Sequence, residues 1–172
     1  QLETSKSFTK KMCKQKKIPT GNYKIFSRED DAKKFLREQP KPYVIKADGL
    51  AAGKGVLVSS NIEESDQFIS SIFEGKIGLE KSKVIIEEYL EGQEMSVFFA
   101  IDKNTMKFVG SAQDYKRAFD QDRGPNTGGM GAFSPSPLLT KRTLDKIVNK
   151  IIKPTVEYMR EIGSEFSGIL YA

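Results

Sequence analysis

The sequence predicts an α+β fold made of two lobes, each with an antiparallel sheet. Helix-like and strand-like segments alternate along the 172 residues, and several neighbouring strands are joined by turns short enough for hairpins. A chain of this length suits one ordinary domain or two small lobes. Together these observations favour antiparallel pairing within each lobe over a doubly wound parallel sheet.

Composition restricts the class of protein. Hydrophobic residues make up 38% of the chain, and no apolar run approaches the ~20 residues that a membrane-spanning helix needs. The basic, polar start does not resemble a signal peptide. A single cysteine, Cys13, cannot form an internal disulfide and fits a reducing compartment. We therefore predict a cytoplasmic protein with no membrane partner. Because histidine is absent, a His-based triad and a His-ligated zinc site are excluded within this chain.

The net charge of +5 comes largely from a run of lysines near the start: Lys6, Lys10, Lys11, Lys14, Lys16 and Lys17. Such a run can meet nucleic acid. Neither an aromatic platform nor a second basic patch accompanies it. We therefore interpret the run as a solvated helix face and expect no nucleic-acid partner.

The first half of the chain contains three predicted helices and three predicted strands. The helices cover 4–17, capped by Thr4 or Ser5, then 28–38, where Ser27 and Asp30 resemble a capping box, and 62–73, capped by Asn61 with Glu64. The strands cover 22–26, 43–46 and 56–58. Pro19 ends the first helix, and the segment 39–42 separates the second helix from the strand at 43.

The second half begins with predicted strands over 84–90, 95–101 and 107–112. From 113 to 137 the pattern matches neither helix nor strand, and an ordered domain seldom carries a loop this long without a function. A helix is predicted over 141–162, with Thr140 as its N-cap and a kink at Pro154. A last strand begins at Ile169.

The loop between the strands at 43–46 and 56–58 is built of small residues: Gly49, Ala51, Ala52, Gly53 and Gly55. Such a loop lets backbone N–H groups approach a ligand, and Lys46 and Lys54 place ammonium groups beside them. The pattern suggests a flap over a polyphosphate, although a solvated hairpin remains the alternative. A P-loop is excluded because Lys54 is followed by Gly55 and a strand, and the G-x-G-x-x-G fingerprint fails at Val58.

The strand end Glu87-Glu88-Tyr89-Leu90, followed by Glu94, suits an adenosine site. A strand end offers backbone groups to the adenine edge, and a carboxylate a few residues on can accept hydrogen bonds from ribose hydroxyls. A solvated acidic turn is the alternative. Joined to the lysine-flanked glycine loop, the nucleotide interpretation is favoured.

The long segment carries groups suited to an anionic substrate. Asp114, Lys116, Arg117 and Arg123 supply charge, while Asn126, Thr127, Gly128 and Gly129 offer an amide, a hydroxyl and unobstructed backbone N–H groups. Such groups can hold a phosphate or a transferring phosphoryl group. A flexible surface loop is the alternative, which we disfavour because Phe119, Met130 and Phe133 are expected to anchor the segment.

Four segments together resemble the glycinamide ribonucleotide synthetase family, the phosphoribosylamine–glycine ligases of purine synthesis. They are IPT at 18–20, VIKADGLAAGKGV at 44–56, IIEEYLEGQEMS at 85–96, and QDYKR through GPNTGGMGAFSPSP at 113–137. The resemblance runs over nearly the whole chain, and GPNTGGMGA is its most specific part. Thr4 and Tyr115 depart from the family, which usually has Gly and His there.

The resemblance implies an ATP-grasp fold, incomplete at both ends. Its expected parts are an entry helix over 1–20, a small lid subdomain over 21–92 and a larger, truncated core subdomain over 93–172. The implied reaction begins when ATP phosphorylates the glycine carboxylate to glycyl phosphate. The amine of 5-phosphoribosylamine then displaces phosphate, which gives glycinamide ribonucleotide, ADP and phosphate.

The resemblance also assigns residues to roles. Lys6 and Lys46 meet the ATP phosphates, and the loop Gly49, Leu50, Ala51, Ala52, Gly53, Lys54 and Gly55 closes over them. Adenine is held by Glu87, Glu88, Tyr89 and Leu90, and the ribose by Glu94. Glycine and phosphoribosylamine are held by Asp114, Lys116, Arg117, Asn126, Thr127, Gly128, Gly129 and Met130. Of these, Lys116 and Arg117 are the expected catalytic residues, acting by positioning and charge neutralisation.

No metal ligand is predicted within this chain. The resemblance implies Mg²⁺ or Mn²⁺ held by residues downstream of Ala172, so we expect the chain as given to be inactive alone. Two other functions stay open. One is a different ATP-grasp ligase with another carboxylate and amine, and the other is a nucleotide-binding module without chemistry of its own.

Overall fold

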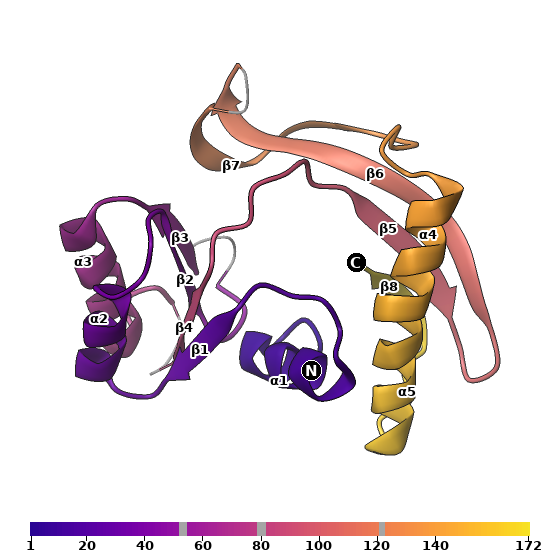
Figure 1. Ribbon diagram of the computed structural model, residues 1–172, viewed down its shortest axis with the longest axis horizontal. Coiled ribbons are helices and arrows are strands. Elements are labelled where there is room, and N and C mark those ends of the chain that lie inside the picture. Colours follow the sequence, from indigo (N-terminus) through magenta and orange to yellow (C-terminus); the bar gives the residue numbers. More distant parts are fainter. Residues whose placement is uncertain (52–54, 79–81, 121–122) are drawn as a thin grey trace. The chain divides into compact units, whose positions relative to one another are not determined.

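The computed structural model describes residues 1–51, 55–78, 82–120 and 123–172 (Figure 1). The chain forms two compact units. Unit 1 comprises residues 1–15 and 20–91, and unit 2 comprises residues 16–19 and 92–172. The predicted flap residues Ala52, Gly53 and Lys54 lie outside the described ranges.

The sheet of unit 1 contains β1 (Tyr23–Phe26), β2 (Tyr43–Ala47), β3 (Val56–Ser59) and β4 (Val84–Glu87) in the order β1-β4-β2-β3. All three pairings are antiparallel, as the sequence predicted. β4 is shorter than the predicted strand 84–90. The residues from Glu88 to Leu90 therefore follow the strand rather than form its end.

Three helices accompany this sheet: α1 (Lys6–Lys16), all but its last residue in unit 1, α2 (Glu29–Leu36) and α3 (Ile62–Phe73). Figure 1 shows α2 and α3 together on one side of the sheet and α1 on the other. Side chains that alternate along the strands, such as Ile45 and Ile86, are buried in the core that includes Leu36 and Ile69. On the other face, Glu87 of β4 forms an ion pair with Lys10 of α1.

The helix starts follow the predicted caps in part. Asn61 Oδ1 accepts a hydrogen bond from Glu64 N at 2.9 Å, which confirms that cap. Ser5 Oγ accepts from Phe8 N at 3.2 Å at the start of α1. The capping box at Ser27 is wrong, because the N-cap of α2 is Arg28 and makes no side-chain cap. The acidic first turn 29–31 instead complements the positive end of the helix dipole.

The sheet of unit 2 contains β5 (Ser96–Ile101), β6 (Met106–Phe119), β7 (Arg123–Phe133) and β8 (Gly168–Tyr171) in the order β7-β6-β5-β8. Its pairings are also antiparallel. Alternate residues of β5, Val97, Phe99 and Ile101, are buried against Ile152 and Val156 of the following helical segment.

The largest difference from the sequence prediction lies in residues 113–137. Most of this segment is not a loop, because β6 continues to Phe119 and returns as β7, with Asp114 opposite Ala132 and Tyr115 opposite Gly131. The register shifts twice between Tyr115 and Phe119. A two-stranded ribbon whose faces are largely exposed needs no alternation of apolar residues, so the usual strand signal is absent.

The helix predicted over 141–162 is present as three consecutive parts. They are α4 (Lys141–Ile147), a π-helical turn η1 (Val148–Ile152) and α5 (Lys153–Glu161). Thr140 Oγ1 accepts from Thr143 N at 3.1 Å, which confirms the N-cap. Pro154 has no N–H to donate and its ring crowds the preceding turn, so the chain widens that turn instead of keeping regular α-helical bonding.

Within the described residues, no helix combines the length and the apolar character that crossing a membrane requires.

Candidate functional site

Lys46 and Glu87 meet on the face of the unit 1 sheet that lies away from α2 and α3. Lys46 pairs in register with Ile85, so Glu87 is its diagonal neighbour on the same face. Lys46 Nζ donates to Glu87 Oε2 at 3.0 Å. The Glu87 side chain is only 7% exposed, and no described residue offers its Oε1 atom a hydrogen bond. The Lys46 side chain is 28% exposed and can therefore still meet a ligand.

Lys10 joins the same carboxylate from α1, although the sequence did not suggest it. Its Nζ lies 3.0 Å from Glu87 Oε2 and donates to Thr20 Oγ1 at 2.8 Å. With 12% of its side chain exposed, Lys10 is not part of a solvated face, so that interpretation is wrong for this residue. The spacing of the helix could have indicated its partial burial. Lys10 stands three residues after Ser7 and three before Cys13, so it shares a helix face with these two buried residues.

Lys6, predicted to meet phosphates, lies at the start of α1 and donates to the Gly49 carbonyl oxygen at 2.7 Å. This bond ties α1 to the beginning of the glycine-rich loop. Burial lowers the pKa of Lys6, and the positive charge of nearby Lys46 lowers it further, whereas Asp48 and Glu87 oppose the shift. Two ammonium groups close enough to repel one another form a natural position for an anion.

Asp48 holds the start of α1 against the end of β2 through several hydrogen bonds. Its Oδ1 accepts hydrogen bonds from Ser7 N at 3.0 Å and Ser5 Oγ at 3.1 Å, and its Oδ2 accepts from the Ser7 hydroxyl. The carboxylate therefore caps the first turn of α1, which has no acidic residue of its own. Burial alone would raise the pKa of Asp48, but the hydrogen bonds from Ser7 and Ser5 together hold it below its usual range.

The predicted adenine residues follow directly after β4. Glu88 N donates to the Asn22 carbonyl oxygen at 2.9 Å, and Asn22 Nδ2 donates to Glu88 Oε2 at 2.7 Å. Tyr89 and Leu90 are 40% and 65% exposed, and within the described residues their backbones make no hydrogen bond. Backbone groups without a hydrogen-bond partner in an exposed segment suit the edge of a nucleobase.

The predicted ribose and substrate residues belong to unit 2. Asp114 and Lys116 form an ion pair on β6, and their hydrogen bond raises the pKa of Lys116, with a smaller contribution from the nearby Glu94 carboxylate. Asp114 and Lys116 are therefore brought together. Thr127 Oγ1 donates to the Lys116 carbonyl oxygen at 2.9 Å and accepts from Gly129 N at 3.1 Å, which adds β7 to this group.

For two of the predicted substrate residues the structure describes the backbone alone. Arg117 and Asn126 stand opposite one another in register, while their side chains lie outside the described part of the structure. Met130 is 59% exposed and Phe119 is 66% exposed, so the expectation that they anchor this segment is wrong. Phe133 is 38% exposed and stacks on Tyr115 with ring centroids 5.9 Å apart. The backbone ladder, rather than apolar anchoring, holds the ribbon.

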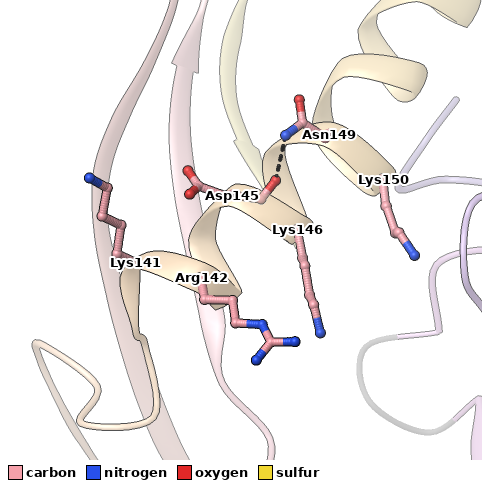
Figure 2. Close-up of a pocket in the computed structure, with 6 residues that line it drawn as sticks. All are labelled: Lys141, Arg142, Asp145, Lys146, Asn149 and Lys150. Carbon is pink, nitrogen blue, oxygen red and sulfur yellow. Dashed lines mark hydrogen bonds between the residues drawn. The ribbon is translucent and has the colours of Figure 1, made fainter.

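The expectation that the chain carries no second basic patch is wrong, because one lies on α4 and the π-helical turn after it, where residues distant from the first lysine run gather on one helix. A shallow hollow of about 570 Å³ is lined by Lys141, Arg142, Asp145, Lys146, Asn149 and Lys150. Figure 2 shows Arg142, Lys146 and Lys150, spaced four residues apart, extending from the same side of the helix. None of the predicted site residues lines this hollow.

Among the described residues, no group of three or more acidic, histidine or cysteine side chains is placed to hold a metal ion. A divalent cation stays a prediction from the family resemblance.

Comparisons with known proteins cover almost the whole chain. A family model described as "Phosphoribosylglycinamide synthetase, ATP-grasp (A) domain" matches residues 4–172. The phosphoribosylamine–glycine ligase of Brucella melitensis is 48% identical over 172 residues, which is 100% of this chain and 40% of that protein. The chloroplastic enzyme of the same name from Arabidopsis thaliana is 49% identical, over 99% of this chain and 32% of that protein.

Among solved structures, the phosphoribosylamine–glycine ligase of Thermotoga maritima matches with a TM-score of 0.89 at 35% identity. The match covers 99% of this chain and 43% of that one. The chain thus spans at most 43% of the length of any of these three proteins.

Proposed function

The chain belongs to the phosphoribosylglycinamide synthetase family, and from this premise we propose that it forms the ATP-binding part of a phosphoribosylamine–glycine ligase. Its fold is that of the ATP-grasp enzymes. The proposed reaction phosphorylates the glycine carboxylate with ATP, after which the amine of 5-phosphoribosylamine displaces phosphate. The products are glycinamide ribonucleotide, ADP and phosphate.

One observation carries the ATP assignment: Lys6 Nζ donates to the Gly49 carbonyl oxygen at the start of the glycine-rich loop, and Lys46, with a 28% exposed side chain, stands on β2 just before the same loop. In our proposal both ammonium groups bind the phosphates, and the loop from Gly49 to Gly55 covers them. The Glu88–Leu90 backbone binds the adenine edge. The orphaned Glu87 Oε1 atom is a ready acceptor for an amino group at this position.

The unit 2 residues would act on the other reactants. We assign the ribose hydroxyls to Glu94, and the glycine carboxylate and the phosphoribosylamine to the group around Asp114, Lys116 and Thr127. Lys116 and Arg117 would neutralise charge that develops on the transferring phosphoryl group. Catalysis would then consist mainly of holding the two reacting groups in line and excluding water.

A divalent cation, Mg²⁺ or Mn²⁺, would neutralise phosphate charge in such a reaction. As the family resemblance implies, we propose that its ligands lie downstream of Ala172. We also propose that residues 21–92 act as the lid and residues 93–172 as part of the core. We also propose a cytoplasmic location, which the single cysteine favours; the Arabidopsis relative differs in that its name places it in the chloroplast.

The function can be tested with the full-length protein that contains this chain. We expect release of ADP and phosphate only when glycine and 5-phosphoribosylamine are both present. Glycine labelled with ¹⁸O in its carboxylate should transfer one ¹⁸O atom to the released phosphate, because glycyl phosphate breaks at its carbon–oxygen bond when the amine attacks.

Other small amino acids and bicarbonate serve as competing carboxylates. Turnover with one of them in place of glycine would support a different ATP-grasp ligase. Nucleotide binding without turnover on any carboxylate would support a binding module. Phosphate free of ¹⁸O during glycine-dependent turnover would contradict the acyl phosphate.

A further inference from the structure

Lys10 and Lys46 share one carboxylate oxygen, and this sharing determines how much positive charge the site presents. Both Nζ atoms lie 3.0 Å from Glu87 Oε2, one reaching it from α1 and the other from β2. We propose that Lys10 is a positioning residue that offsets the charge of Glu87, so that the charge of Lys46 stays available to the nucleotide phosphates. The inference rests on the proposed ATP site.

The charges support this division of roles. A carboxylate paired with Lys46 alone would leave a neutral pair, which attracts phosphate weakly. With Lys10 included, the three groups carry a net charge of +1. Because Glu87 is 7% exposed, water screens these charges less than it screens charges on the surface. The phosphates would therefore experience most of this net charge through Lys46.

The hydrogen bonds show why Lys10 itself is not the phosphate ligand. Its ammonium group donates to Thr20 Oγ1 at 2.8 Å and to the Gly21 carbonyl oxygen at 3.5 Å, and it pairs with Glu87. Two hydrogen bonds and one ion pair therefore already engage this ammonium group. Lys46, in contrast, has Glu87 as its only acceptor among the described residues and is more than twice as exposed, at 28% against 12%.

Tyr23 keeps Lys10 in place. The Tyr23 hydroxyl donates to the Lys10 carbonyl oxygen at 2.8 Å, and the Lys10 ammonium lies 5.4 Å from the centre of the Tyr23 ring. Tyr23 is also the register partner of Glu87 across β1 and β4. Helix, strand and carboxylate are thus fixed relative to one another within unit 1, and Lys10 supplies charge from a defined position.

The experiment compares Lys10→Met with the unsubstituted protein by calorimetric titration of adenosine, AMP, ADP and ATP. We expect adenosine affinity to change less than about twofold, whereas ATP affinity falls roughly tenfold or more, with the loss growing as phosphates are added. Raising the salt concentration should shrink the difference. Lys14→Met removes the same charge from an exposed position on the same helix and should leave the whole series unchanged.

Two further variants separate charge from structure. Lys10→Arg keeps the charge and should retain most of the ATP affinity. Adding Glu87→Gln to Lys10→Met removes the opposing carboxylate and should recover much of the lost ATP affinity, because Lys46 is then no longer neutralised. Thermal unfolding of each variant checks that unit 1 is folded.

The inference is overturned if Lys10→Met weakens adenosine and ATP by the same factor, or if it leaves ATP affinity unchanged. The first result would show that Lys10 only stabilises α1. Failure of the double variant to recover ATP affinity would also contradict the charge argument. If the unsubstituted protein binds adenosine and ATP equally well, or neither of them, the proposed ATP site itself is wrong.

Discussion

Replacing Asp48 by asparagine tests how firmly α1 is held against the start of the glycine-rich loop. Asp48 accepts hydrogen bonds from Ser7 N, Ser7 Oγ and Ser5 Oγ, and its charge lies at the positive end of the α1 dipole. Asparagine keeps the shape and one acceptor but removes the charge. The variant should therefore fold while losing stability at neutral pH.

Two contributions determine how much unfolding free energy the Asp48→Asn variant should lose. Loss of the charge–dipole interaction at a partly buried helix start costs about 0.3–2 kcal/mol. Exchange of charge-assisted for neutral hydrogen bonds costs about 1 kcal/mol more. A total of roughly 1–3 kcal/mol corresponds to a fall in Tm of about 2–12 °C for a protein of this size.

The direction in which the stability difference changes with pH provides a second test. Since the pKa of Asp48 is lowered in the folded state, its stabilising contribution is complete above the unfolded-state pKa of about 4. It is lost as the pH falls through the lower folded-state value. The difference in Tm between the original protein and Asp48→Asn should stay constant from pH 7 to about pH 5 and shrink below about pH 4.

Circular dichroism melts between pH 7 and pH 3 measure this difference. Asp145→Asn, an exposed position on α4, makes the same chemical change outside unit 1 and serves as the control. The reasoning is refuted if Asp48→Asn melts at the temperature of the original protein at pH 7. A difference that persists undiminished at pH 3 would also refute it.

Three further substitutions probe the core, a helix cap and the adenine position. Leu36→Ala, at a fully buried position, should cost about 2–5 kcal/mol in a denaturant titration, and a loss below 1 kcal/mol would contradict the assigned core. Thr140→Ala should cost about 1 kcal/mol by the same titration, with recovery in Thr140→Ser, because it removes the bond to Thr143 N. Leu90→Pro, at a 65% exposed position outside the strands, removes the backbone N–H proposed for the adenine edge and should weaken adenosine binding in a calorimetric titration, whereas Leu90→Ala keeps it; equal adenosine affinity in the two variants would argue against the adenine assignment.

Much of the fold could be predicted because the buried elements carry strong local signals. The strands over β2, β4 and β5 have β-branched or aromatic residues at buried positions, and Asn61 and Thr140 mark helix starts through side chains that suit caps. The β6–β7 ribbon could not be predicted this way. It is stabilised by backbone pairing and has exposed faces, so nothing in its side-chain pattern distinguishes it from a loop.

Some residues of the candidate site could also be predicted from the sequence, and others could not. The glycine-rich loop and Lys46 are recognisable because their composition is unusual. Lys10 was missed because a lysine within a basic run suggests solvent, and only the fold brings it to Glu87. Asp48 was missed for a related reason, since its partners Ser5 and Ser7 stand more than forty residues earlier in the chain. Contacts between residues far apart in the chain cannot be inferred from neighbouring residues in the sequence.

A crystal structure of the protein with a non-hydrolysable ATP analogue would show where the triphosphate binds, because unit 1 and the basic surface of α4 offer different positions for it. We expect phosphate oxygens within hydrogen-bond distance of the Lys6 and Lys46 ammonium groups, and adenine beside the Glu88–Leu90 backbone. A triphosphate bound instead over Arg142, Lys146 and Lys150, with Lys46 still contacting only Glu87, would contradict it.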